Sequence, residues 1–171
     1  MEKIKIILDA DVIIHFSKGG WLYALPSIFK GYEYSILDTV YKEILNPIRN
    51  ELDNQIHFLK NITLIPFNPR GEMLKEYAKL SSTLGKGESA CMSYCKYNHD
   101  VIGSSNLRDI KVYCQKNGLT YLTTIDFLYY AVKNGIMTVK EAHQFIIDVN
   151  NKDSKLPSVN FETFVSETVL L

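Results

Sequence analysis

Short apolar runs alternate with longer amphipathic stretches along most of the chain. Apolar residues recur at helical spacing in the longer stretches, whereas the short runs predict strands. The strands are expected at residues 3–8, 34–37, 62–67, 100–104 and 120–124. Because strands that alternate with helices are typical of βαβ units, the pattern predicts a three-layer α/β/α sandwich with a mainly parallel central sheet of four to five strands.

The helices that this pattern predicts lie between the strands and after the last one. They cover residues 12–17, 21–29, 39–45, 48–60, 72–80, 88–97, 106–115, 126–133 and 138–150, and a last short helix is expected within 159–169. The segment 21–29 is apolar on several sides, and we expect a core helix that Pro26 interrupts. In the helix over 88–97, Glu88 stands at the top of an apolar stripe that should face the core.

The length of 171 residues is that of a single domain. We expect residues 1–150 to form this domain and residues 151–171 to form a C-terminal extension that packs on it. The chain carries 19 basic and 19 acidic residues, so its net charge is zero. This balance gives no global support for nucleic-acid binding, although a local basic rim can act alone.

The three cysteines, Cys91, Cys95 and Cys114, are odd in number, and no secretory signal precedes them. We therefore expect reduced thiols in a cytoplasmic protein, buried as small hydrophobic residues. No apolar run approaches the roughly 20 residues of a membrane span, so no membrane association is expected.

Two acids follow the first predicted strand directly. Side chains i and i+2 of a strand point the same way, so if the chain stays extended through Ala10, Asp9 and Asp11 aim at one spot beyond the strand's carboxyl end. Open α/β sheets bind ligands there, and a divalent cation would relieve the repulsion between two carboxylates. The alternative is that Asp11 caps the following helix and that Asp9 is a solvated loop acid.

Three further acids, Glu43, Glu88 and Asp109, occupy related positions. Glu43 lies on the helix after the second strand, and Asp109 lies in the first turn of the helix after the fourth. Glu88 opens the helix that leads into the fourth strand. Because the helix-leading ends of parallel strands lie on one rim, these acids are expected to meet. Each also has a local explanation: a helix surface for Glu43, the helix dipole for Glu88, and a capping pair with Asn106 for Asp109.

The order and spacing of these acids resemble those of a PIN domain, of the small bacterial type that includes the VapC-like toxin ribonucleases. Residues 7–13 are similar to the opening strand of the family, and Glu43 matches its second acid. Glu88, which follows a glycine, matches the third acid. Thr124 stands near a threonine or serine that commonly follows the last strand. The resemblance extends from residue 3 to residue 125 and on toward the next helix.

The sequence departs from this family after the fourth strand. The family usually has an aspartate there, often followed three residues later by another. Here the place is taken by Ser104, Ser105 and Asn106, so that Asn106 matches the first aspartate and Asp109 the second. An asparagine offers a neutral carbonyl ligand but less charge, which bears on the metal stoichiometry and the rate.

The resemblance implies an endoribonuclease that hydrolyses RNA phosphodiester bonds with Mg²⁺ or Mn²⁺ as cofactor. The residues expected to take part in catalysis are Asp9, Glu43, Glu88 and Asp109, and those expected to hold the metal are Asp9, Asp11, Glu88 and Asp109. The residues expected to orient water or the phosphate are Ser104, Ser105, Asn106 and Thr124. The residues expected to touch the RNA backbone are Arg108 and Lys111.

A second function class remains open from the sequence. A PIN-like module whose acid set is incomplete would bind RNA or protein without cutting. The resemblance also implies a toxin–antitoxin pair, with a small antitoxin as partner, and a dimer of the chain.

Overall fold

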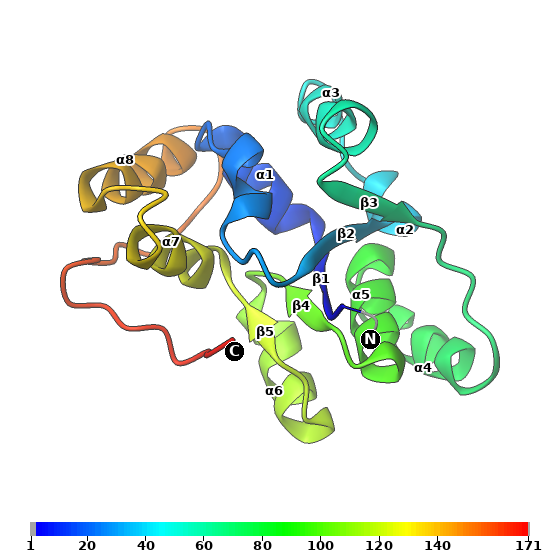
Figure 1. Ribbon diagram of the computed structural model, residues 1–171. Coiled ribbons are helices and arrows are strands. Elements are labelled where there is room, and N and C mark those ends of the chain that lie inside the picture. Colours follow the sequence, from blue (N-terminus) through cyan, green and yellow to red (C-terminus); the bar gives the residue numbers. More distant parts are fainter. Residues whose placement is uncertain (1–2, 171) are drawn as a thin grey trace.

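The five predicted strands form one parallel sheet in the order β3-β2-β1-β4-β5 in the computed structural model, which describes residues 3–170 (Figure 1). The strands are β1 (Lys5–Leu8), β2 (Glu33–Leu37), β3 (Ile62–Ile65), β4 (Val101–Gly103) and β5 (Tyr121–Leu122). In the central strand, Ile7 pairs with Ser35 of β2 and with Ile102 of β4. Residues 1, 2 and 171, the outer ends of the expected domain and extension, lie outside the described residues.

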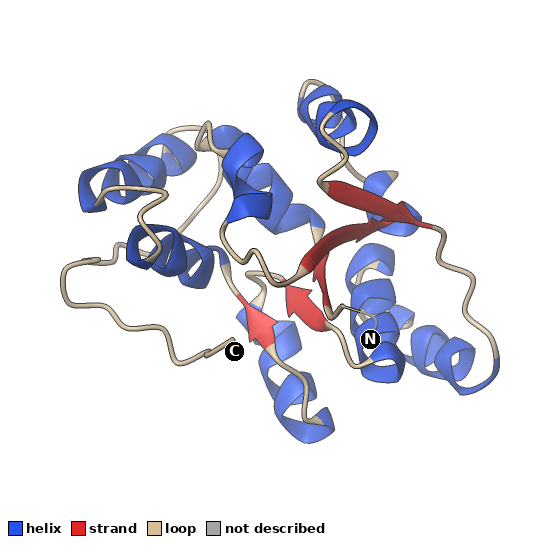
Figure 2. Ribbon diagram, in the orientation of Figure 1, coloured by secondary structure: helices blue, strands red, loops and turns tan. Residues whose placement is uncertain are grey.

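Helices cover both faces of the sheet, which confirms the predicted three-layer α/β/α sandwich (Figure 2). One face carries α1 (Ala10–Lys18), α7 (Thr124–Lys133) and α8 (Val139–Asn150). The other carries α4 (Gly71–Ser81), α5 (Lys86–Asn98) and α6 (Leu107–Asn117). The short helices α2 (Asp38–Tyr41) and α3 (Ile48–Asp53) lie near the edge strand β3 (Figure 1).

The core is built on β1, whose Ile6, Ile7 and Leu8 are fully buried. A strand that is buried on both faces reads as a continuous apolar run, which is why the first strand is so clear in the sequence. On the face of α1, the ring of Phe16 packs edge-on against Phe127 of α7 at 6.0 Å between centroids. Its other aromatic neighbour is Phe145 of α8, at 5.0 Å. The three cysteines are buried and free, as expected.

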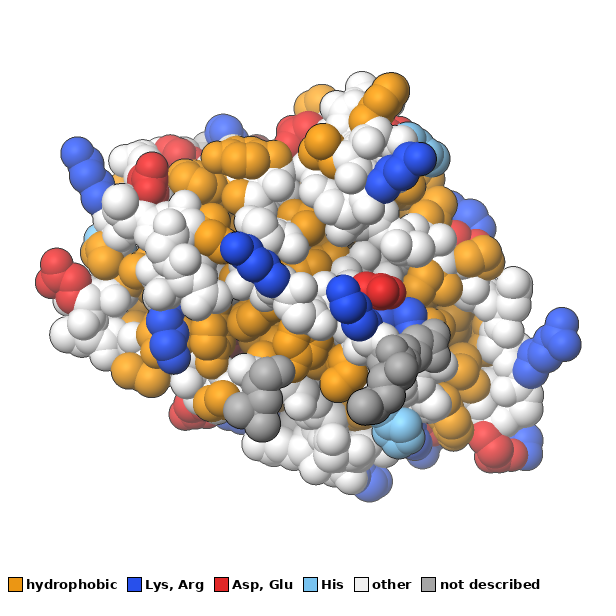
Figure 3. Space-filling view, in the orientation of Figure 1, with side chains coloured by type: hydrophobic (Ala, Val, Ile, Leu, Met, Phe, Trp, Pro, Cys, Tyr) orange, Lys and Arg blue, Asp and Glu red, His pale blue; other side chains and the backbone are white. Residues whose placement is uncertain are grey.

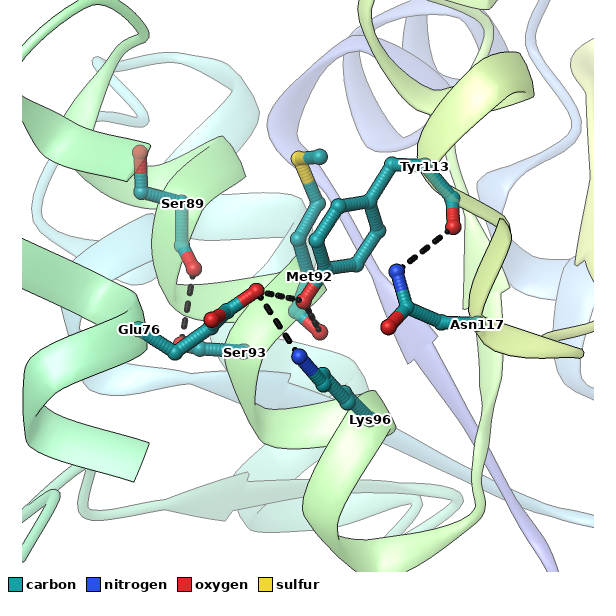
Figure 4. Close-up of polar contacts among 7 residues, drawn as sticks. All are labelled: Glu76, Ser89, Met92, Ser93, Lys96, Tyr113 and Asn117. Atoms are coloured by element: carbon teal, nitrogen blue, oxygen red, sulfur yellow. Dashed lines mark hydrogen bonds and ion pairs between the residues drawn. The ribbon is translucent and has the colours of Figure 1, made fainter. Parts of the chain in front are cut away.

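A polar contact ties the helices of the opposite face together (Figure 4). Glu76 of α4 accepts a hydrogen bond from the hydroxyl of Tyr113 on α6 at 3.0 Å and pairs with Lys96 of α5 at 3.1 Å. The glutamate and the lysine are both mostly shielded from solvent, so this ion pair is screened less than an exposed one. The three helices are therefore fixed to one another by one carboxylate as well as by packing.

Four predicted helices differ from the observed structure. The segment 21–29 forms a 3₁₀ helix, η1 (Leu22–Ser27), since Pro26 cannot donate an α-helical hydrogen bond. The helix expected to reach residue 45 ends at Tyr41, because the N–H groups of Glu43 and Ile44 bond carbonyls three residues back instead of four. The expected helix 48–60 divides into α3 and a π-helical stretch, η2 (Asn54–Phe58). No helix forms within residues 159–169.

The segment after α8 lies against α7 and α8 without regular structure. Ser166 donates a hydrogen bond of 2.6 Å to the buried carboxylate of Asp126, and Thr168 donates one of 3.0 Å to the carbonyl of Tyr121. Phe164 packs edge-on against Tyr129 at 5.8 Å. Side-chain contacts with α7 and β5 therefore hold this segment in place of the backbone hydrogen bonds of the expected helix. Across residues 3–170, none of the helices combines the length and apolarity that crossing a bilayer requires.

Candidate functional site

The candidate site lies between β1 and β4, where the chain leaves neighbouring strands toward opposite faces of the sheet. β1 continues into α1 on one face and β4 continues toward α6 on the other (Figure 1). The backbone N–H of Asp9 donates to the carbonyl of Gly103 at 2.8 Å, so the two strand ends are held together. In open α/β sheets this switch of direction creates the crevice in which ligands bind.

Asp9 and Asp11 are both at this crevice, but not in the geometry expected from the sequence. The backbone does not stay extended through Ala10, because α1 begins there and Asp9 is its N-cap residue. Asp9 Oδ1 accepts from the N–H of Ala10 at 2.8 Å. Asp11, in the first turn, accepts from the N–H of Val12 at 2.7 Å and from that of Ser105 at 2.8 Å. The alternative in which Asp11 is the cap is therefore wrong as well.

Asn106 joins two of the expected site residues. Its amide nitrogen donates to Glu88 Oε1 at 2.9 Å and to Asp109 Oδ2 at 2.8 Å. The asparagine that departs from the family pattern thus lies between the two acids it was expected to accompany. Asn106 is also the N-cap residue of α6, but its side chain makes no capping bond, so the local explanation of Asn106 and Asp109 as a capping pair is wrong.

Glu43 reaches the site from the turn after α2. Its Oε1 accepts from the backbone N–H of Gly87 at 3.0 Å, at the start of α5. A Cβ atom on residue 87 would lie 2.6 Å from Glu43 Oε2, closer than van der Waals contact permits. The glycine before Glu88 is thus the residue that lets a carboxylate approach the first turn of α5, a role that sequence reasoning missed.

The electrostatics of the site are those of crowded carboxylates. Burial, and after it the charge of Asp11, raises the pKa of Asp9 to about 8. Burial and the charges of Asp109 and Asp11 raise the pKa of Glu88 to about 7. Burial also raises the pKa of Asp11, against the hydrogen bond from Ser105. Within residues 3–170 no lysine or arginine forms an ion pair with these acids or with Glu43.

A hydrogen-bonded chain of neutral groups runs from the site into the core. Ser105 Oγ donates to Thr124 Oγ1 at 2.7 Å and accepts from the N–H of Thr124 at 2.8 Å. Thr124 Oγ1 lies 2.8 Å from Nδ1 of His15, and desolvation lowers the pKa of this histidine to about 4. Ser104 and Thr124 are fully buried, so they position the loop rather than touch a ligand. His15 was not anticipated; its signal was a polar residue within the apolar face of α1.

The two cationic residues expected at the RNA backbone, Arg108 and Lys111, are both exposed on α6 beside Asp109. The structure gives neither of them an ion pair within residues 3–170. Lys111 also lines a pocket together with Ser105, whose backbone N–H bonds Asp11.

The donors at the site fit a hard divalent cation in kind. Carboxylate and amide oxygens are the ligands that Mg²⁺ prefers, and one or two carboxylates with water are enough to hold it. Burial raises the pKa of Asp9, and no lysine or arginine among residues 3–170 pairs with this carboxyl to lower it. Among residues 3–170, no three His, Cys, Asp or Glu side chains are gathered into a preformed coordination shell. The chemistry of the donors fits the metal, whereas their spacing is that of a site with few protein ligands.

Comparisons with known proteins do not assign the chain to a family. Neither the protein-family models nor the curated proteins contain a match to the chain.

Proposed function

We propose that this protein is a metal-dependent endoribonuclease that hydrolyses RNA phosphodiester bonds. The observation that carries the proposal is the convergence of Asp9, Asp11 and Glu88 at the switch point of the sheet, with no lysine or arginine of residues 3–170 paired to them. Maintaining several partly buried carboxylates together is costly, and a catalytic cation offsets that cost. The resemblance to PIN domains supports the same activity and extends it to the toxin of a toxin–antitoxin pair.

The residues of the site divide the work of binding and positioning. Asp9 and Glu88 would hold Mg²⁺ or Mn²⁺, with Asp11, Glu43 and Asp109 completing the negative surface around it. The bound metal supplies activation of a water and neutralisation of charge on the scissile phosphate. Asn106 keeps the carboxylates of Glu88 and Asp109 on the same side of the crevice. Ser105, held by Thr124, fixes Asp11 through its backbone N–H.

One observation favours a second candidate, a module that binds RNA without cutting it. The amide of Asn106 already satisfies one oxygen of Glu88 and one of Asp109, so these acids are bonded to a neutral group instead of a cation. An asparagine also contributes no charge to the metal. This arrangement would weaken catalysis while leaving the crevice intact.

A cleavage assay on single-stranded and structured RNA with Mg²⁺ or Mn²⁺ separates the two candidates. The nuclease is expected to leave 5′-phosphate and 3′-hydroxyl ends, to stop when the metal is chelated, and to lose roughly a hundred-fold or more in Asp9→Asn. The control Asp153→Asn changes an exposed aspartate of the C-terminal segment and should cut as the wild type does. If Asn106→Asp cuts RNA and the wild type does not, the natural chain is the second candidate, the module that binds RNA without cutting it. If neither chain cuts RNA with Mn²⁺, and Asp9→Asn leaves RNA binding unchanged, the nuclease proposal fails.

A further inference from the structure

A pocket of about 350 Å³ lies beside the acidic site. It is bounded by residues around α6, by β5 and the start of α7, and by the C-terminal segment. Figure 3 shows hydrophobic side chains at several places on the face of the molecule that it draws. The lining residues that carry the argument are Ser105, Lys111, Tyr121, Lys155, Phe164 and Val165.

Ser105 makes the pocket continuous with the acidic site. Its backbone N–H bonds Asp11 at 2.8 Å, and the same residue lines the pocket. A chain molecule bound with one group at Asp11 would therefore pass directly over Ser105 into the pocket. The two places are adjacent parts of one surface.

The lining of the pocket combines aromatic and aliphatic surface with charged side chains, two of which are lysines. Tyr121 and Phe164 offer rings, and Lys111 and Lys155 offer ammonium groups that form no ion pair within residues 3–170. Two carboxylates line the pocket as well: Asp126 is already satisfied by hydrogen bonds from Thr123 and Ser166, and Glu167 is exposed at its edge. Rings beside free cations are the combination with which proteins bind single-stranded nucleic acid.

We propose that this pocket receives one nucleoside of an RNA strand, with the neighbouring phosphate at the acidic site. This inference rests on the proposed function, because it names the part of the substrate next to the bond that is cut. The volume is at the lower end of the range for ligand pockets, which suits a single nucleoside better than a folded partner. Lys111 and Lys155 hold the phosphate–sugar backbone, and the rings contact the base.

Binding of nucleoside 5′-monophosphates tests the pocket without any cleavage. We would titrate each of the four nucleotides, ribose 5-phosphate and inorganic phosphate into the protein without divalent metal, and follow backbone amide signals by NMR. The expected result is saturable shifts at Tyr121, Val165 and Thr168, with at least one nucleotide about ten-fold tighter than ribose 5-phosphate. Equal binding of ribose 5-phosphate would mean an anion site only and would overturn the proposal. Shifts produced by an aromatic dipeptide but by no nucleotide would assign the pocket to a peptide and overturn it too.

Two matched variants of the C-terminal segment complete the test. Val165 lines this pocket, Val169 does not, and both side chains are 69% exposed, so a glutamate is tolerated at either position. Val165→Glu is expected to weaken nucleotide binding at least about five-fold by repelling the phosphate, whereas Val169→Glu leaves it unchanged.

The same variants separate this inference from the proposed function. If the wild type cuts RNA and Val165→Glu cuts it as well as Val169→Glu does, the pocket is no part of the substrate site, although the nuclease stands. If nucleotides bind and Val165→Glu alone weakens them, the pocket is a nucleoside site whether or not the wild type cuts RNA.

Discussion

Replacing Asp9 by asparagine should make the protein more stable while it abolishes activity. Asp9 is only 7% exposed, and its carboxyl faces the charges of Asp11 and Glu88. In the unfolded chain Asp9 ionises near its ordinary pKa of 3.8, but in the fold its pKa is about 8. Between these values only the folded state keeps the proton. The stability that the protonated group contributes is therefore complete below the lower pKa and is lost as pH rises through the upper one.

The size of the effect follows from this window. Each pH unit between the two pKa values costs the wild type about 1.4 kcal/mol of unfolding free energy. From about pH 5 to about pH 7.5 the advantage of Asp9→Asn should grow by about 3 kcal/mol, an upper limit because the fold can relax around the charge. For a chain of this length that is a difference of roughly 6–12 °C in Tm. The asparagine keeps a carbonyl oxygen for the N–H of Ala10, so the start of α1 is preserved.

Urea unfolding of both chains at the two pH values, with a chelator present, measures this growth directly. Asp153→Asn serves as the control, since its exposed side chain should shift stability by less than about 0.5 kcal/mol at either pH. If the difference in unfolding free energy between Asp9→Asn and the wild type stays constant with pH, or shrinks as pH rises, Asp9 is not a buried carboxyl with a raised pKa.

Three further outcomes are expected. Gly87→Ala should change the unfolding free energy by less than about 1 kcal/mol, because the exposed end of Glu43 can move away and alanine favours the helix, yet RNA cleavage should fall; unchanged cleavage would show that the carboxylate at this place is dispensable. Thr124→Val should cost about 1–3 kcal/mol in urea unfolding, because the hydroxyl of Ser105 and Nδ1 of His15 lose their partner; a neutral substitution would contradict the importance of this chain of hydrogen bonds. A fixed Mg²⁺ concentration, ten times the Kd found near neutral pH, should raise the unfolding free energy there by about 1.4 kcal/mol, and by less near pH 5, where Asp9 and Glu88 are more fully protonated. A thermal scan with no such dependence on pH would speak against metal binding at the acids.

The sequence predicted the sheet well and the ends of the helices less well. The continuous apolar run of β1 could be recognised because both faces of a central parallel strand are buried. Segments in which a proline or long-range hydrogen bonds override the local apolar pattern were predicted poorly. Pro26 changes an apolar stretch from an α-helix to a 3₁₀ helix. The segment after α8 uses its polar side chains for hydrogen bonds to Asp126 and Tyr121 in the rest of the domain. Such long-range bonds leave no periodic trace in the sequence.

The sequence predicted which acids belong to the site, but it did not predict how their side chains are arranged. The topology of a parallel sheet is enough to bring the end of β1 near the end of β4, so Asp9 and Asp11 could be placed there. The two hydrogen bonds from the amide of Asn106 to Glu88 and Asp109 depend on side-chain rotamers, which the spacing of residues along the sequence does not determine. The close approach of Glu43 to Gly87 depends on tertiary contact between segments far apart in the chain.

The pairing of β1 with β4 has a consequence for how the chain reaches its native state. Ile7 and Ile102 are neighbours in the sheet, yet the chain between them includes two further strands, five α-helices and the stretches η1 and η2 with their connections. Contacts of such long sequence separation form late and slowly, because the entropy of closing the loop is lost before they contribute. Until residues 101–103 arrive, one edge of the most apolar strand lacks a partner and is open to other chains. The crevice that gathers the acids is thus completed only when this pairing forms, and active-site assembly should be among the last events of folding.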